Sequence, residues 1–401
     1  MAQKNLDKFF DSYPSPYPFD VAKRIKEGYR ECFDLFEEYK LIFPEKNSDY
    51  SNISNVLILG CGHVEGLYHA LRNPKINFDC IDISNNAILS ANENSNNLKL
   101  KNVNFQMQDI TSYSSKTKYD VIFSTNVLQY VEDPSSVLQH ICTLLKDDGA
   151  LILSLPSSYY YEDVDFMRKV LLNLGYEYNN ADHIDEAFNF VSGLDGIHPS
   201  TVRMVESNEL IDKKDFVSRY MVPYHQSFSI IQLFNLIESA NLFFQKWYYN
   251  HLYYPSALIR PVASKHASLF DRINSLDNIT KWDTVCKIFR SRNDRFSHTL
   301  CLRKEQEFEF IDEMLLEDDK SIVAIKPFQY IESIPNTPEK YAIMTNFKRK
   351  LDEDETNILD LLKKPTSLEK LLNNKAVNIS ANNTIDIIRK LSESGIIHLY
   401  Q

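Results

Sequence analysis

The sequence predicts an α/β fold, in which a doubly wound parallel sheet carries helices on both faces. Short apolar runs of strand length alternate with helical patterns between Val56 and Leu155, a rhythm typical of βα units. Two closely spaced glycines, Gly60 and Gly62, directly follow the first of these runs. Acidic residues end two of the later runs. Because open α/β sheets bind ligands at the carboxyl ends of their strands, the sequence predicts a binding site at that edge.

Composition and charge restrict the function of the 401 residues. A hydrophobic content of 43% is ample for compact cores, and a formal charge of −11 argues against nucleic-acid binding. Six cysteines form no C-x-x-C pair and ten histidines show no paired spacing, so we expect reduced thiols and no metal site. No signal segment and no apolar run near ~20 residues is present. We therefore expect a cytoplasmic protein that does not bind membranes.

Residues 1–50 are expected to form an N-terminal strap and a helix. The aromatic segment from Tyr13 to Phe19 carries a proline at every second position, which enforces an extended path. A helix is predicted from about Val21 to Tyr39. The segment is either a strap that covers core surface or a lid over a ligand, and the sequence leaves both readings open.

The glycine pair lies between a predicted strand and a predicted helix. Val56 to Leu59 is a buried strand, and helical periodicity begins at Leu67. Glycines let the backbone approach a ligand closely, and the unpaired N–H groups at the start of the helix face that ligand. The pattern fits a nucleotide-like molecule, although a purely structural turn is the alternative. The third glycine of the dinucleotide fingerprint is displaced by one position, because Glu65 precedes Gly66.

The ends of the next two strands carry carboxylates. A second strand from Ile76 to Ile81 closes with Asp82, twenty residues beyond Gly62, where a carboxylate can accept both ribose hydroxyl protons. The third strand, Val103 to Gln108, ends in Asp109. This carboxylate can accept a hydrogen bond from an exocyclic amine such as adenine N6, or it can cap a turn.

The remaining elements of the sheet follow in order. Ser84 caps a helix from about Asn86 to Glu93, and Asp133 with Pro134 starts another. The further predicted strands are Tyr119 to Ser124, Ala150 to Leu155, Leu242 to Tyr248 and His298 to Arg303. A mostly helical insertion is expected at about 157–228, and a second excursion at about 249–296. Residues 305–350 are predicted to form an acidic linker or extension. Residues 351–401 are predicted to form three short helices and a closing strand.

The motifs together resemble class I S-adenosylmethionine-dependent methyltransferases over about residues 5–305. The glycine turn is similar to their first motif, Asp82 to their ribose ligand, and Gln108-Asp109-Ile110 to their adenine-contacting motif. The segment from Tyr119 to Leu128 is similar to their fourth motif. The closest resemblance is to a branch with an upstream Tyr-Pro-Tyr-Pro-like segment. Some protein-lysine methyltransferases with a C-terminal regulatory domain are similar more loosely.

The resemblance implies a cofactor, S-adenosylmethionine, and a Rossmann-like seven-stranded methyltransferase sheet over 51–304. Ile58 and Val64 stand where many members carry an acidic residue and a glycine. The cofactor-binding residues that it implies are Gly60, Cys61, Gly62, Asp82, Ile83, Asp109, Ile110, Ser124 and Asn126. Separately, the three short helices and closing strand of 351–401 resemble a small α+β winged-helix-like domain, and the net negative charge of this stretch makes a protein its possible partner.

The expected reaction is methyl transfer to an unidentified acceptor, a protein or a small molecule. We favour a nitrogen nucleophile, because aromatic ring faces attract cationic groups. The tyrosines predicted to line the acceptor pocket are Tyr13, Tyr17, Tyr130, Tyr159 and Tyr160. Two other classes remain open: a nucleotide-dependent reductase, since Gly60-x-Gly62-x-x-x-Gly66 also suits some dinucleotide enzymes, and a non-catalytic cofactor-binding protein that acts through its C-terminal region.

Overall fold

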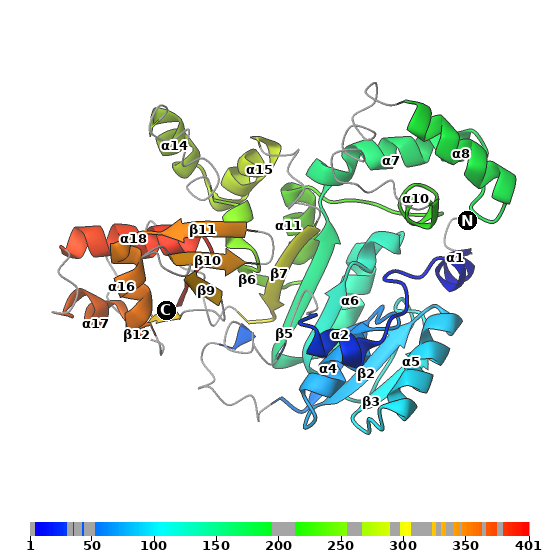
Figure 1. Cartoon of the computed structure of the whole chain (residues 1–401), viewed down its shortest axis with the longest axis horizontal. Helices are drawn as coiled ribbons and strands as arrows, with labels where there is room; N and C mark the ends of the chain where they lie inside the picture. The colour runs from blue at the N-terminus through cyan, green and yellow to red at the C-terminus, as the bar shows by residue number, and fades with distance from the viewer. Residues whose placement is uncertain are drawn as a thin grey trace. The chain divides into compact units, whose positions relative to one another are not determined.

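The computed structural model describes residues 5–29, 35, 42–43, 53–194, 213–254, 267–288, 297–305, 323–325, 330–333, 340–344, 347–362, 366–374 and 380–400. The chain divides into two compact units, and each is described by itself. The first unit contains residues 1–34, 51–242 and 290–299, and the second contains residues 35–50, 243–289 and 300–401. Figure 1 labels their helices and strands.

A seven-stranded sheet has the order β3-β2-β1-β4-β5-β7-β6. Its parallel strands are β1 (Asn55–Leu59), β2 (Asn77–Asp82), β3 (Val103–Met107), β4 (Tyr119–Thr125) and β5 (Leu145–Pro156). Strands β1 and β4 are buried almost throughout, which explains why they read as continuous apolar runs. The strand order reverses between β1 and β4, the place where open α/β sheets bind ligands. This confirms the predicted α/β class.

Two of the helices that flank the sheet, α5 (Asn85–Asn97) and α6 (Pro134–Leu144), begin at the predicted caps. The sheet is also flanked by α4 (Glu65–Arg72) and α11 (Ile230–Ser239). The side chain of Ser84 accepts a hydrogen bond from the N–H of Ala87, and that of Asp133 accepts one from Ser136. Helix α5 continues four residues past the predicted end at Glu93, because its asparagine-rich end keeps the helical hydrogen bonds.

The last two strands are antiparallel. Strands β6 (Phe243–Trp247) and β7 (Ser297–Arg303) pair in the register Phe243↔Arg303 and Trp247↔Leu300. The sheet is therefore mixed, because this antiparallel pair extends the parallel strands. The excursion between the two strands contains η4 (Asn250–Leu252), α14 (Ala267–Asn274) and α15 (Asn278–Ile288) among its described residues.

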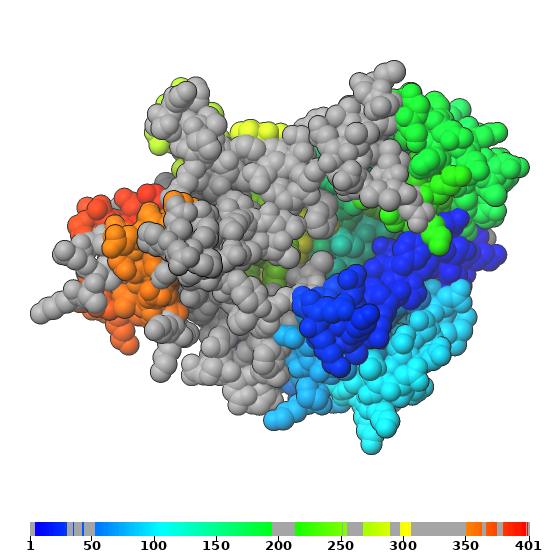
Figure 2. Space-filling view, in the orientation of Figure 1, coloured from blue at the N-terminus to red at the C-terminus, as the bar shows by residue number. Residues whose placement is uncertain are grey.

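The insertion after β5 and the N-terminal helix share one apolar core. The helices involved are α1 (Leu6–Ser12), α7 (Ser158–Asn173), α8 (Ala181–Gly193) and α10 (Lys213–Tyr220). Leu6 and Phe9 of α1 are buried in the same cluster as Val164 and Met167 of α7. Figure 2 shows the N-terminal segment, in blue, between the green insertion and the cyan helices of the sheet. Helix α1 thus packs against the insertion.

The predicted helix from Val21 to Tyr39 is shorter where the structure describes it. Helix α2 covers Val21–Lys26 and begins at an Asp20 cap. Gly28 follows with φ of +93°, a conformation that ends a helix. Most of the residues that the prediction included beyond Tyr29 lie outside the described residues.

Within the stretch expected to be an acidic linker or extension, 305–350, the described residues form paired strands. They are β8 (Val323–Ile325), β9 (Tyr330–Ser333), β10 (Lys340–Met344) and the start of β11 (Phe347–Leu351). Strands β9, β10 and β11 form an antiparallel sheet. Isoleucine, tyrosine and valine favour strands, and this preference outweighs the neighbouring charges.

The C-terminal residues build a second small core. Its elements are α16 (Glu353–Leu361), β12 (Thr366–Ser367), α17 (Leu368–Leu372), α18 (Ala381–Glu393) and β13 (His398–Tyr400). Strand β8 pairs with both β12 and β13, so residues from the expected linker complete this sheet. Ile358, Ile388 and Ile397 are buried at its centre. No helix within the described ranges is both long and apolar enough to cross a bilayer.

Candidate functional site

A cavity of about 300 Å³ lies at the carboxyl ends of the parallel strands. It is at the lower end of the size range of small-molecule sites. Loops after β1 to β4 supply one side of its wall, and the N-terminal segment supplies the other. Of the predicted cofactor and acceptor residues, those that line the cavity are Gly60, Cys61, Gly62, Asp82, Ile83, Asp109, Ile110, Asn126 and Tyr130.

The glycine turn forms the floor of this cavity. Gly60 has φ of +65°, and a Cβ atom there would lie 2.0 Å from Cγ2 of Val127. Gly62 has φ of +52°. Both values lie in the left-handed region that favours glycine. The N–H groups of Gly60 and Cys61 donate to the carbonyl oxygen of Ile81 at 2.8 and 3.1 Å, so the turn is fixed against the end of β2.

The carboxylate of Asp82 accepts hydrogen bonds from two backbone segments at the floor of the cavity. Its Oδ2 accepts the N–H of Gly62 at 2.8 Å, and its Oδ1 accepts the N–H of Ser84 at 2.8 Å. Burial raises the pKa of this carboxyl, while the backbone hydrogen bonds oppose that shift. Each carboxylate oxygen keeps further acceptor capacity, so Asp82 can bind ligand hydroxyls while it holds the turn.

Asp109 is a turn cap that also lies at the wall of the cavity. Its Oδ1 accepts both the N–H and the hydroxyl of Thr111 at 2.8 Å, which makes it a turn cap. It also lines the cavity with Ile110. Its Oδ2 has no hydrogen-bond partner within the described part of the chain and can accept one from a ligand amine.

The end of β4 places Asn126 at the cavity and Ser124 below it. Asn126 has φ of +53°, and its Oδ1 accepts the hydroxyl of Ser297 at 3.1 Å. Ser124 is fully buried. The backbone then turns into the short helix η3 (Leu128–Tyr130), which brings Tyr130 to the wall of the cavity. Of these two predicted cofactor residues, Asn126 therefore lines the cavity and Ser124 does not.

The N-terminal segment closes the cavity opposite the glycine turn. Pro14, Ser15 and Pro16 line it directly. Asp11 fastens the segment, because its Oδ1 accepts the Ser84 hydroxyl at 2.7 Å and the Asn86 N–H at 3.0 Å. These partners lie at the start of α5, next to Asp82.

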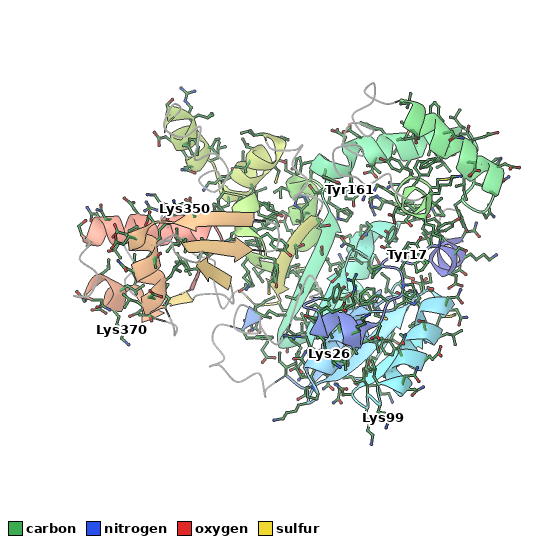
Figure 3. The ribbon with its side chains drawn as sticks, in the orientation of Figure 1. Tyr17, Lys26, Lys99, Tyr161, Lys350 and Lys370 are labelled. Atoms are coloured by element: carbon green, nitrogen blue, oxygen red, sulfur yellow. The ribbon has the colours of Figure 1, made fainter. Side chains whose placement is uncertain are left out.

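Of the five tyrosines predicted to line the acceptor pocket, Tyr130 lines this cavity and the other four do not. The Tyr13 hydroxyl donates to the Tyr178 carbonyl at 3.2 Å, which ties the segment to the insertion. Nζ of Lys214 lies over the ring of Tyr17, 5.4 Å from the ring centroid. Figure 3 shows Tyr17 on the N-terminal segment. The two tyrosines from the start of α7 are buried. The Tyr159 hydroxyl accepts the N–H of Ile230 at 3.0 Å, and Tyr160 is 2% exposed.

His63 is a cavity residue that the sequence did not single out. It follows Gly62 directly, lines the cavity and is 6% exposed. Neither ring nitrogen has a hydrogen-bond partner in the described part of the chain, and burial lowers the pKa of the imidazole. A neutral imidazole can donate one hydrogen bond and accept one. Its only signal in the sequence was its position beside the glycine turn.

Comparison with known proteins agrees with this geometry. A family model described as a methyltransferase domain matches residues 51–194. Residues 51–194 form a class I S-adenosylmethionine-dependent methyltransferase domain. The matched segment holds the glycine turn, Asp82, Asp109 and Asn126, so one side of the cavity wall belongs to the methyltransferase domain and the N-terminal segment adds the other. No group of three or more His, Cys, Asp and Glu side chains in the described ranges could hold a metal ion.

Relatives of the methyltransferase domain act on different acceptors. Malonyl-[acyl-carrier protein] O-methyltransferase 2 of Ilyobacter polytropus is 26% identical over 168 residues, 39% of this chain and 63% of that protein. (S)-coclaurine N-methyltransferase of Papaver somniferum is 30% identical over 154 residues, 37% of this chain and 42% of that protein. The chain thus matches less than two thirds of the length of either relative. PKMT2 from Rickettsia typhi, solved with AdoHcy, aligns with a TM-score of 0.60 at 15% identity, over 92% of this chain and 75% of that one. This likeness shows a shared fold.

Proposed function

We propose that this protein binds S-adenosylmethionine in the cavity at the glycine turn and transfers its methyl group to an acceptor. The observation that carries the proposal is the carboxylate of Asp82, which is buried at the cavity and held by two backbone N–H groups. This arrangement fixes the acceptor oxygens where a ribose would lie. The cofactor supplies an activated methyl group when bound.

The residues of the cavity fit the polar groups of that cofactor. Asp82 would accept the ribose hydroxyls, and Oδ2 of Asp109 would accept the adenine amine. Gly60 and Gly62 leave room for close approach of the methionine part. The unpaired ring nitrogens of His63 would gain partners from its charged ends. The N-terminal segment would cover the ligand and exclude water, which suits an in-line displacement that needs positioning more than acid–base groups.

Within this proposal the acceptor carries a nitrogen nucleophile, on a protein or on a small molecule. Tyr130 places an aromatic ring at the cavity wall, and rings of this kind stabilise nearby cations. None of the relatives described above is a reductase, so the reductase alternative gains no support. The non-catalytic alternative makes a different prediction: the protein binds the cofactor but transfers no methyl group.

The test of this function is transfer of labelled methyl groups from S-adenosylmethionine into a lysate of the source cell. We expect label in an amine-bearing product and a rate that rises with pH, because an amine attacks only in its deprotonated form. Asp82→Ala is the matched control and should incorporate little label. Tight cofactor binding with no labelled product at any pH would instead support the non-catalytic alternative.

The C-terminal residues 351–401 are proposed to form a winged-helix-like module that contacts a protein. Helices α16, α17 and α18 with the strands β12 and β13 supply the helices and closing strand of such a module. The sequence of this stretch contains eight acidic residues (Asp352, Glu353, Asp354, Glu355, Asp360, Glu369, Asp386, Glu393) and six basic ones (Lys363, Lys364, Lys370, Lys375, Arg389, Lys390), so its formal charge is −2. This charge disfavours nucleic acid as the partner.

The N-terminal segment is proposed to act as a lid, and Asp11 provides the test. Asp11→Ala removes the acceptor of the Ser84 hydroxyl and Asn86 N–H, so S-adenosylhomocysteine should dissociate about tenfold faster, equivalent to roughly 1.4 kcal/mol. Stopped-flow displacement measures this rate. Asp7→Ala is the control, because Asp7 is an exposed carboxylate on the same helix. Equal dissociation rates for both variants would make the segment a structural strap.

A further inference from the structure

The buried ring of His63 faces the cavity at the glycine turn without a protein partner. The residue is 6% exposed and lines the cavity, and neither ring nitrogen has a hydrogen-bond partner in the described ranges. A buried polar group without a partner destabilises the folded state. Because this one lies at a cavity, a ligand can supply the missing hydrogen bonds.

The charged groups in the lining of this cavity are unequal in sign. Glu65, Asp82 and Asp109 contribute three carboxylates. No lysine or arginine is among the described lining residues. His63 is therefore the only described lining residue whose side chain can carry a positive charge, and a negatively charged ligand group can form an ion pair with this side chain alone.

The order of the strands places His63 away from the residues proposed to hold the adenine. The carboxyl ends of the strands follow one another in the order β3-β2-β1-β4. In the proposed function Asp109, after β3, accepts the adenine amine, and Asp82, at the end of β2, accepts the ribose hydroxyls. The part of the cofactor beyond the ribose is its amino acid end, which then reaches the ends of β1 and β4. His63 lies in the turn between β1 and α4.

The start of α4 separates the two charges of an amino acid. Glu65 is the first residue of α4, and its Oε1 accepts the hydroxyl of Thr125, the last residue of β4, at 3.1 Å. A carboxylate attracts an ammonium group and repels another carboxylate. Val64 gives α4 no side-chain cap, so the first N–H groups of the helix add to the attraction for an anion. The carboxylate of the ligand therefore pairs with His63.

We propose that His63 binds the carboxylate of the cofactor's amino acid part and takes up a proton when it does so, which makes the affinity for the cofactor depend on pH. This inference rests on the proposed function. Burial lowers the pKa of the free imidazole, so it is neutral at pH 7. A carboxylate beside the ring favours the charged form and raises this pKa in the complex. The proton comes from solvent, so the affinity rises as the pH falls between the two pKa values.

The other titratable groups in the lining do not produce the same effect. Among the described lining residues they are Cys61, Glu65, Asp82, Asp109 and Tyr130, and the N-terminal segment contributes none. Burial raises the pKa of the Cys61 thiol and that of the Tyr130 hydroxyl, so both stay neutral near pH 7. Burial also raises the pKa of Asp82. Protonation of a carboxylate removes an acceptor from the ligand, so its effect on affinity has the opposite sign.

Proton uptake is tested on the wild type with two ligands. S-adenosylhomocysteine carries the amino acid part, whereas 5′-methylthioadenosine keeps the adenosine and the sulfur but lacks it. Isothermal titration calorimetry at pH 7 in phosphate, MOPS and Tris gives the number of protons exchanged, because the ionisation enthalpies of these buffers differ. We expect net uptake with S-adenosylhomocysteine and none with 5′-methylthioadenosine. Between pH 6 and 8 the affinity ratio of the two ligands should fall about tenfold, which corresponds to a rise of one unit in the pKa of His63.

Two results on the wild type have different meanings. Equal proton exchange with the two ligands would overturn the role of His63, because 5′-methylthioadenosine has no carboxylate. Failure of both ligands to bind would overturn the proposed function instead. This comparison does not depend on the folding of any variant.

His63→Gln identifies the group that takes up the proton. Glutamine keeps an N–H donor but does not titrate. The variant should bind S-adenosylhomocysteine about tenfold more weakly, with no proton uptake and with unchanged affinity for 5′-methylthioadenosine. His183→Gln is the matched control and should behave as the wild type, since His183 lies on α8, where its Nδ1 accepts the N–H of Glu177. Wild-type proton uptake in His63→Gln, or an equal loss of affinity for both ligands, would overturn the proposal.

Discussion

Asp82→Ala is expected to weaken the binding of S-adenosylhomocysteine at least about 100-fold, because two hydrogen bonds from ribose hydroxyls to a carboxylate contribute roughly 1.5–3 kcal/mol each. The structure adds a second effect. The same carboxylate holds the N–H groups of Gly62 and Ser84, so the variant should also unfold at a lower temperature. Isothermal titration calorimetry and thermal melts measure the two effects separately.

Asp109→Ala is the comparison for this prediction. Asp109 is expected to make one hydrogen bond to the adenine, and its other oxygen caps a local turn. We therefore expect a smaller loss of affinity, about tenfold. If Asp82→Ala binds S-adenosylhomocysteine as the wild type does, Asp82 does not contact the cofactor, and its role is limited to holding the glycine turn.

Gly66→Ala is expected to lower the free energy of unfolding by about 1–3 kcal/mol, because overpacking a core costs energy of this order. A Cβ atom at position 66 would lie 2.6 Å from both Sγ of Cys80 and Cε1 of Phe105. All of these atoms are in the contact between α4 and the sheet. Gly66 thus allows the close helix–sheet packing that the third glycine of the fingerprint provides elsewhere.

Gly193→Ala is the matched control, since it places the same methyl group at the end of α8 with nothing within 4 Å. Alanine should leave the stability there unchanged or slightly raised. Urea unfolding of the two variants gives the comparison. Equal stability of Gly66→Ala and the wild type would show that α4 shifts to accept the extra methyl group.

The sequence predicted the sheet well because its signals are local. Each parallel strand is an apolar run with its own boundary residues, and Ser84 and Asp133 cap the helices that were predicted from them. The position of the binding site could be predicted from one rule, that the carboxyl ends of parallel strands meet at one edge of the sheet. Asp82 and Asp109 therefore fall in one cavity, although 27 positions separate them in the sequence.

Features that depend on contacts between distant segments could not be predicted. The pair of Asp165 and His225 joins residues 60 positions apart, and Asp11 meets Ser84 across 73 positions. Neither pairing leaves a periodic or compositional signal. Strand β8, within the expected linker or extension, was missed for a related reason: it is short, and its partners β12 and β13 come more than 40 residues later.

Titration of the wild-type protein with S-adenosylhomocysteine and, separately, with NADH tests the central claim most directly. The cavity at the glycine turn should bind S-adenosylhomocysteine with one-to-one stoichiometry and leave NADH fluorescence unchanged. Loss of the calorimetric signal in Asp82→Ala would place that binding at the end of β2. Saturable binding of NADH, with no heat from S-adenosylhomocysteine, would contradict the assignment of this cavity to a methyl donor.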